Sequence, residues 1–212
     1  LNLFCCKKDR AQELHQRGLL VQSEELEEAR NREIPLQPHH HWRMAMREFE
    51  WASGLMPLWE ESLKTDPEEE LERALDLYFF SRDHKQSHLS RVVALERSMQ
   101  LLVTLTAKPL YLRESTLARV ARDWGARQDA VKVLNALAAR IISTKQVNTR
   151  EPFLIPVESN KWKMADGNHG NFIFSSILEG LEVFSAFSSF YSGPSARGRL
   201  EALHKLGLGS PE

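Results

Sequence analysis

The feature that most constrains the fold is a pair of amphipathic helical patterns in residues 112–142, joined at Gly125. In both patterns apolar side chains recur every three or four residues, which is the spacing of a helix that buries one stripe. The first stripe comprises Leu117, Val120, Ala121 and Trp124. The second comprises Ala130, Val131, Leu134, Leu137, Ala138 and Ile141. Two helices cannot bury both stripes alone, so the pattern predicts a helical hairpin with further helices packed beside it.

The small residues of this hairpin resemble those of a tetratricopeptide-type repeat. Ala118 stands seven residues before Gly125 and Ala130 stands five residues after it, and the large packing positions that follow are Leu134 and Leu137. In that family small residues let two helices approach closely, and a glycine permits the tight turn between them. The resemblance covers one unit of roughly 30 residues and implies a protein-interaction function, since such repeats mediate contacts and not chemistry. No second copy follows at a fixed period, so a generic helical hairpin is the open alternative.

Composition excludes several classes of function. The chain has 212 residues, of which 42% are hydrophobic and 27% charged, and its formal net charge of −1 provides no field that would collect nucleic acid or acidic membrane. No apolar run approaches the roughly 18 residues that span a bilayer. Its two cysteines, Cys5 and Cys6, are adjacent and form no spaced metal motif. We therefore expect a cytoplasmic protein without a cofactor, which binds a protein partner or an upstream domain, and no nucleic acid or membrane.

Pattern changes along the chain predict four segments. Residues 1–8 begin with the strand-like string Leu1–Cys6, which we interpret as the end of a missing upstream domain, because a lone strand has little stability; a frayed terminus is the alternative. Residues 9–143 form a helical domain, and residues 144–170 are rich in proline, glycine and asparagine and form a long loop. Residues 171–212 contain an aromatic helix and a tail that pack on the helical domain. The predicted fold is all-α, a bundle or short repeat-like array of about seven to nine helices.

Local signals predict where several helices begin and end. Gly54 and Pro57 are expected to end the helix that carries Trp42. Asp66 and Pro67 predict the start of the next helix, with the aspartate as its cap and the proline in the first helical position. A long helix is predicted over residues 84–106.

Histidines provide the one hint of a metal site. His84 and His88 are four residues apart on the predicted long helix, as two metal ligands on one helix face would be. A third ligand would have to come from the cluster His39–His41. Two ligands do not make a site, and we favour two surface histidines at the start of a helix.

The polar loop before the aromatic helix is the second candidate site. Its residues are Asp166, Asn168, His169 and Asn171, and its amides could hold a carboxylate or phosphate. His169 could act as an acid or base, but it has no visible partner in the sequence. A structural turn in which Asn171 caps the following helix is the favoured interpretation.

The hairpin also carries a mixed-charge face. Its basic residues are interleaved with acidic ones, which favours a solvent-exposed surface over a phosphate-binding track: Arg113, Arg119, Arg122, Arg127 and Lys132.

Our first hypothesis is a non-catalytic interaction or accessory module, the C-terminal part of a larger protein. Its contact surface would comprise Trp124, the face from Arg113 to Arg127, and the aromatic helix over 172–191. The alternative is the C-terminal region of a bacterial-type methyl- or glycosyltransferase, with its catalytic domain upstream of residue 1 and the loop 152–171 covering its substrate. No catalytic residue is predicted within the chain.

Overall fold

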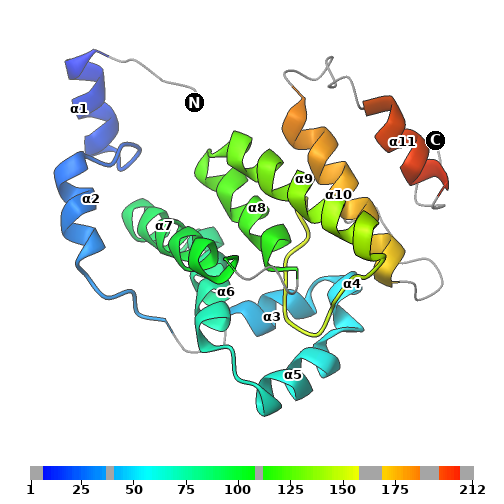
Figure 1. Cartoon of the computed structure of the whole chain (residues 1–212). Coiled ribbons are helices and arrows are strands. Elements are labelled where there is room, and N and C mark those ends of the chain that lie inside the picture. The colour runs from blue at the N-terminus through cyan, green and yellow to red at the C-terminus, as the bar shows by residue number, and fades with distance from the viewer. Residues whose placement is uncertain (1–6, 37–40, 108–111, 158–168, 187–195, 206–212) are drawn as a thin grey trace.

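The computed structural model describes residues 7–36, 41–107, 112–157, 169–186 and 196–205, and these ranges hold eleven α-helices and no strand (Figure 1). The predicted all-α fold is confirmed, with more and shorter helices than expected. The predicted strand Leu1–Cys6 lies outside the described residues. None of the described helices has both the length and the apolar character needed to cross a membrane.

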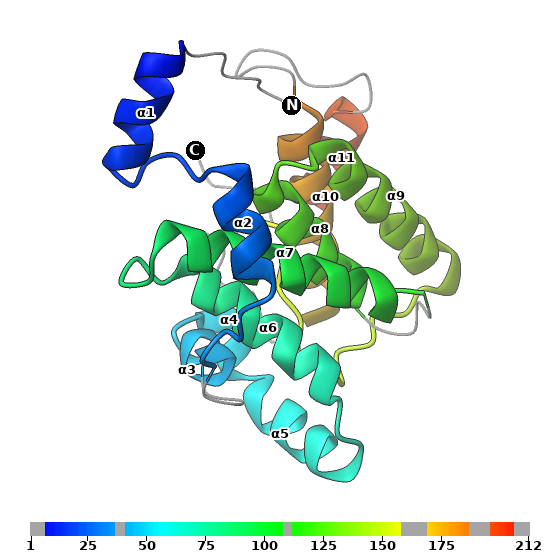
Figure 2. The same cartoon turned by 90° about the vertical axis from the view of Figure 1, so that its left-hand side faces the viewer.

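The first two helices, α1 (Lys8–Gln16) and α2 (Ser23–Arg30), form an N-terminal arm. No residue of α1 is buried, whereas α2 lies along α7 (Figures 1 and 2). Arg30 holds it there through an ion pair of 2.6 Å with Glu96, and Arg97 donates hydrogen bonds to the carbonyl groups of Arg30 and Arg32.

Three short helices follow: α3 (His41–Arg47), α4 (Glu50–Ser53) and α5 (Met56–Thr65). The helix that carries Trp42 ends at Arg47, earlier than predicted, and Gly54 ends the separate helix α4. Pro57 does not end a helix, because it lies in the first turn of α5. The fixed φ of proline and its missing N–H are both tolerated in a first turn. Trp42 and Trp59 are fully buried in the core that these helices share with α6 and α8.

The helices α6 (Glu69–Arg82) and α7 (His88–Leu105) pack against each other at the centre of the molecule. The sequence predicted Asp66 as the cap of α6, and this prediction is wrong. Asp66 is the C-cap of α5, and Glu68 occupies the N-cap of α6. The Asp66 amide donates a hydrogen bond of 2.8 Å to the carbonyl oxygen of Ser62, so this residue belongs to the end of α5. Ser87 caps α7 by accepting a hydrogen bond of 3.1 Å from the amide of Ser90.

The predicted hairpin is present as α8 (Arg113–Trp124) and α9 (Arg127–Thr144). Gly125 adopts the left-handed conformation between them, with a φ of 93°, and the small residues Ala118 of α8 and Ala130 of α9 are completely buried. A glycine is favoured here because a side chain at positive φ is strained. Of the six residues predicted for the stripe of α9, Val131 is only half-buried, and the other five are buried: Ala130, Leu134, Leu137, Ala138 and Ile141.

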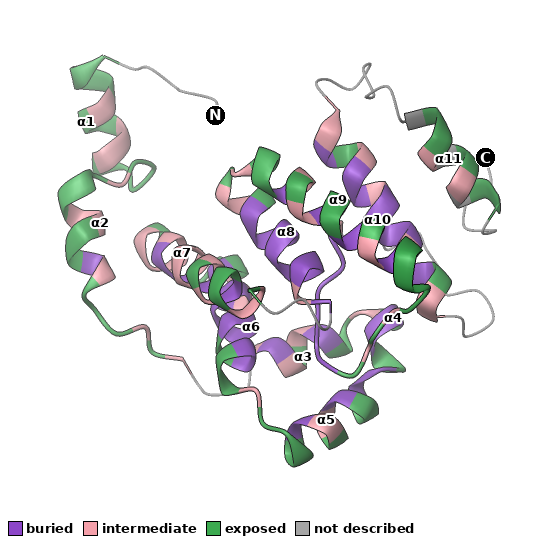
Figure 3. Ribbon diagram, in the orientation of Figure 1, coloured by how far each residue is buried: buried purple, intermediate pink, exposed green. Residues whose placement is uncertain are grey.

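An extended segment, residues 151–157, which we call the buried strap, passes through the core beside α8 (Figure 3). Ser115 donates a hydrogen bond of 2.6 Å to the carbonyl oxygen of Leu154, and Thr116 accepts one of 2.9 Å from the Leu154 amide. Phe153 packs between Trp51 and Trp59, with ring centroids 5.3 and 5.6 Å apart. Side chains of α8 therefore satisfy the backbone of a segment that forms no helix.

The aromatic helix α10 (His169–Ser185) packs along α9, and α11 (Ala196–Lys205) packs on α10. Phe172, Ile177 and Phe184 are buried on α10. Residues 152–156, which the transferase hypothesis assigns to a substrate cover, are buried within this chain.

Candidate functional site

A surface pocket of about 730 Å³ lies where the α8–α9 turn meets the last turn of α10. We call it the hairpin pocket. Its lining combines apolar side chains with two arginines: Arg122, Trp124, Gly125, Ala126, Arg127, Val183 and Phe184. The turn and the aromatic helix, which the sequence predicted as parts of one contact surface, thus meet at a single concave site.

Arg127 fixes the position of α10 at this site. Its guanidinium group donates hydrogen bonds to the carbonyl oxygens of Val183, Phe184 and Ala186. The last carbonyl groups of a helix have no partner within the helix and carry partial negative charge, so a cation at this end is favourable. The guanidinium group of Arg127 is therefore already hydrogen-bonded within the protein.

Arg122, Trp124 and Val183 contribute accessible side chains to the pocket. The Arg122 side chain is 45% exposed, and its guanidinium carbon lies 5.7 Å from the centre of the Phe184 ring. Val183 is also 45% exposed, and Trp124 is half-buried. A ligand entering the pocket would meet an apolar wall, the guanidinium group of Arg122, and the exposed Arg127, which is already hydrogen-bonded to α10.

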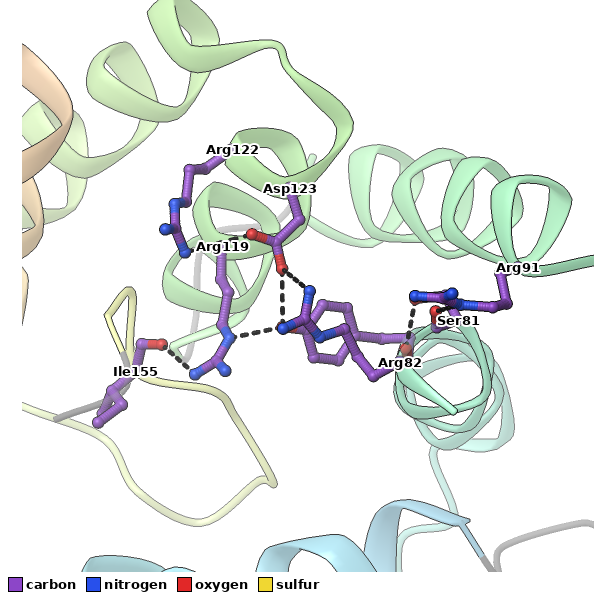
Figure 4. Close-up of polar contacts among 8 residues, drawn as sticks. Ser81, Arg82, Arg91, Arg119, Arg122, Asp123 and Ile155 are labelled. Carbon is purple, nitrogen blue, oxygen red and sulfur yellow. Dashed lines mark hydrogen bonds and ion pairs between the residues drawn. The ribbon is translucent and has the colours of Figure 1, made fainter. Parts of the chain in front are cut away.

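A polar network behind the pocket positions Arg122. Figure 4 shows Asp123 between the guanidinium groups of Arg122 and Arg82, which lie 3.2 and 3.7 Å from its two carboxylate oxygens. The Tyr78 hydroxyl donates a hydrogen bond of 3.0 Å to Asp123 and accepts one of 2.7 Å from Arg119. Burial raises the pKa of Tyr78 to about 12, so the phenol stays neutral at ordinary pH and remains a donor to the carboxylate.

The network has more positive than negative charge. Arg82 and Arg122 contact the Asp123 carboxylate, Arg119 is bonded to the Tyr78 hydroxyl, and Arg127 lines the pocket. The described residues that line the hairpin pocket include no carboxylate. In a chain whose net charge is −1, this corner is locally basic, and it favours an acidic group on whatever binds there.

The structure divides the predicted basic face of α8. Arg122 and Trp124 line the pocket, but Arg119 is only 3% exposed and donates a hydrogen bond to the carbonyl oxygen of Ile155 in the buried strap. Arg113 is 11% exposed and forms ion pairs with Glu68 and Glu151. The predicted continuous face from residue 113 to 127 does not exist, because both arginines point inward to partners that are distant in sequence.

The predicted histidine pair does not share a helix. His84 lies in the turn before α7, and His88 is the first residue of α7, because the Ser87 cap separates them. Both side chains are exposed. No group of three or more potential metal ligands occurs in the part of the chain that the structure describes.

The second candidate loop is described only in part, since Asp166 and Asn168 lie outside the described residues. His169 is the first residue of α10, and its Nε2 is buried near Gly54 without a hydrogen-bond partner. Asn171 is exposed in the first turn of α10 and does not cap it, because the helix begins two residues earlier than predicted. The described residues therefore bring together no acid–base pair here.

Sequence reasoning missed the contribution of Arg82. It lies at the C-terminal end of α6, far from Asp123 in sequence, and no local pattern relates the two residues. No family model matches the chain, and neither the curated proteins nor the solved structures provide a match. The functional assignment therefore rests on the geometry of the chain's own residues.

Proposed function

We propose that this chain is a non-catalytic protein-interaction module, and that its hairpin pocket binds an acidic segment of a partner protein carrying an aromatic or aliphatic side chain. The observation that carries this proposal is the composition of the pocket: Trp124, Val183 and Phe184 lie beside the accessible guanidinium group of Arg122. Aromatic residues and arginine are the anchors most enriched in protein interfaces.

The side chains that line the hairpin pocket do not favour a catalytic function. The described residues of its lining comprise arginine, tryptophan, glycine, alanine, valine and phenylalanine. None of these supplies the nucleophile or the general base that acyl transfer or hydrolysis requires. An apolar wall with a positive rim instead supports recognition by contact and charge.

A selection from a random library of displayed 12-residue peptides, against the purified chain, tests the proposal. We expect the enriched peptides to combine glutamate or aspartate with an aromatic or aliphatic residue. Arg122→Gln should weaken their binding about tenfold, which corresponds to about 1.4 kcal/mol. Arg150→Gln is the matched control, since this exposed arginine lies next to Glu151, the partner of Arg113 at the opposite end of α8.

Two outcomes would count against this function. Enriched peptides without carboxylates would show that the positive rim has no role. Peptides that bind the Arg122→Gln and Arg150→Gln variants equally well would show that binding occurs elsewhere on the chain.

A further inference from the structure

A second surface pocket, which we call the α3–α6 pocket, lies on the other side of the arginine network. Its volume is about 630 Å³, and its lining includes Met44, Ala45, Phe79, Phe80, Arg82 and Asp83. Met44 is 54% exposed, so its side chain is accessible to a partner. Its apolar side chains offer a second anchor site beside the polar lining residues His41, Arg82, Asp83 and Gln86.

One carboxylate connects the two pockets. Arg82 lines the α3–α6 pocket and Arg122 lines the hairpin pocket, and both guanidinium groups contact Asp123 (Figure 4). The Asp123 side chain is 13% exposed, whereas those of Arg82 and Arg122 are 55% and 45% exposed. Solvent between the pockets therefore meets mainly guanidinium groups.

We infer that the two pockets form one bipartite docking surface for an extended partner segment, with an apolar side chain at each end and acidic residues between them. This inference rests on the proposed function and specifies the partner. Charge complementarity places the acidic residues in the middle of the segment, because the exposed cations Arg82 of one pocket and Arg122 of the other share Asp123.

Asp83 restricts which side chain of the partner segment can bind in the α3–α6 pocket. It accepts hydrogen bonds from the amide of Lys85 and the side chain of Gln86, which hold the pKa of its carboxyl below the ordinary value. The Asp83 carboxylate, ionised at neutral pH, lines the α3–α6 pocket and disfavours an acidic residue beside it. The far anchor is therefore apolar, and the acidic residues are confined to the middle of the segment.

Methyl NMR on the full chain tests this inference, with peptides selected from a random 16-residue library that spans about 50 Å when extended. The chain is labelled at its methionine and valine methyl groups. We expect one peptide to shift the Met44 and Val183 signals together, with the same dissociation constant. Met44→Gln and Val183→Thr should each weaken that peptide, by about tenfold and about fivefold.

Val103→Thr is the matched control, because Val103 on α7 is 54% exposed and lines neither pocket. A peptide that needs Val183 but binds Met44→Gln normally would overturn the bipartite inference and leave the proposed function intact. A peptide that responds to neither Val183→Thr nor Arg122→Gln would overturn the proposed function itself.

Discussion

Gly180 shows how a single residue sets the distance between α10 and the buried strap. A Cβ atom at this position would lie 2.6 Å from the Cβ of Pro156 and 3.1 Å from the Cδ1 of Leu134. Both neighbours are buried in the core, so Gly180→Ala is expected to reduce the free energy of unfolding by about 1–3 kcal/mol in urea denaturation. Gly198→Ala is the control, since no atom lies within 4 Å of its added Cβ and alanine is the better helix former. Equal stability of the two variants would contradict the close packing.

Tyr78 makes stability depend on pH in the alkaline range. Its pKa is raised from the ordinary value of 10 to about 12, mainly by burial. Because the folded pKa is the higher one, the unfolded chain loses this proton first, and stability falls as pH rises between about 10 and 12. The loss amounts to about 3 kcal/mol at most, and it should be absent from Tyr78→Phe. Urea denaturation at several pH values measures it; parallel curves for the two proteins would contradict the burial of the phenol.

Among the elements, the buried strap depends most on one charged pair. Arg113 donates two hydrogen bonds to Glu151, at 2.7 and 2.6 Å, and the two side chains are only 11% and 7% exposed. Arg113→Gln leaves the glutamate buried without its cation, so we expect a loss of about 3–5 kcal/mol in the free energy of unfolding. Adding Glu151→Gln should recover part of that loss. Lys132→Gln, which breaks an exposed ion pair with Asp129, should cost less than about 1 kcal/mol.

The contrast between the hairpin and the strap explains what the sequence could predict. The hairpin was predicted because its buried residues follow the helical period and Gly125 marks the turn. Residues 151–157 have no such period, and two prolines interrupt them, so they resembled a loop. Their burial depends on partners such as Ser115 and Thr116 in another element, which no local pattern reveals.

At the scale of the whole molecule, the candidate site was predicted only in part. Trp124 and Arg122 were among the predicted contact residues and line the hairpin pocket, with Phe184 from the predicted aromatic helix. The inward orientation of Arg119 and the approach of Arg82 depend on side-chain contacts between α6 and α8, Arg119 with Tyr78 and Arg82 with Asp123. Such contacts join residues that are distant in sequence, and periodicity within one helix carries no information about them.

The central claim is that a partner segment binds at the corner where α8, α9 and α10 meet. The most direct test is the two-dimensional ¹⁵N–¹H NMR spectrum of the chain, in which each tryptophan side chain gives an indole signal, recorded while a selected acidic peptide is added. We predict that the Trp124 signal, assigned with Trp124→Phe, shifts in a saturable manner. The Trp59 signal should not move, because the Trp59 side chain is buried and its indole N–H donates a hydrogen bond of 2.8 Å to the carbonyl oxygen of Thr149. A peptide that binds and leaves the Trp124 signal unmoved would contradict the claim.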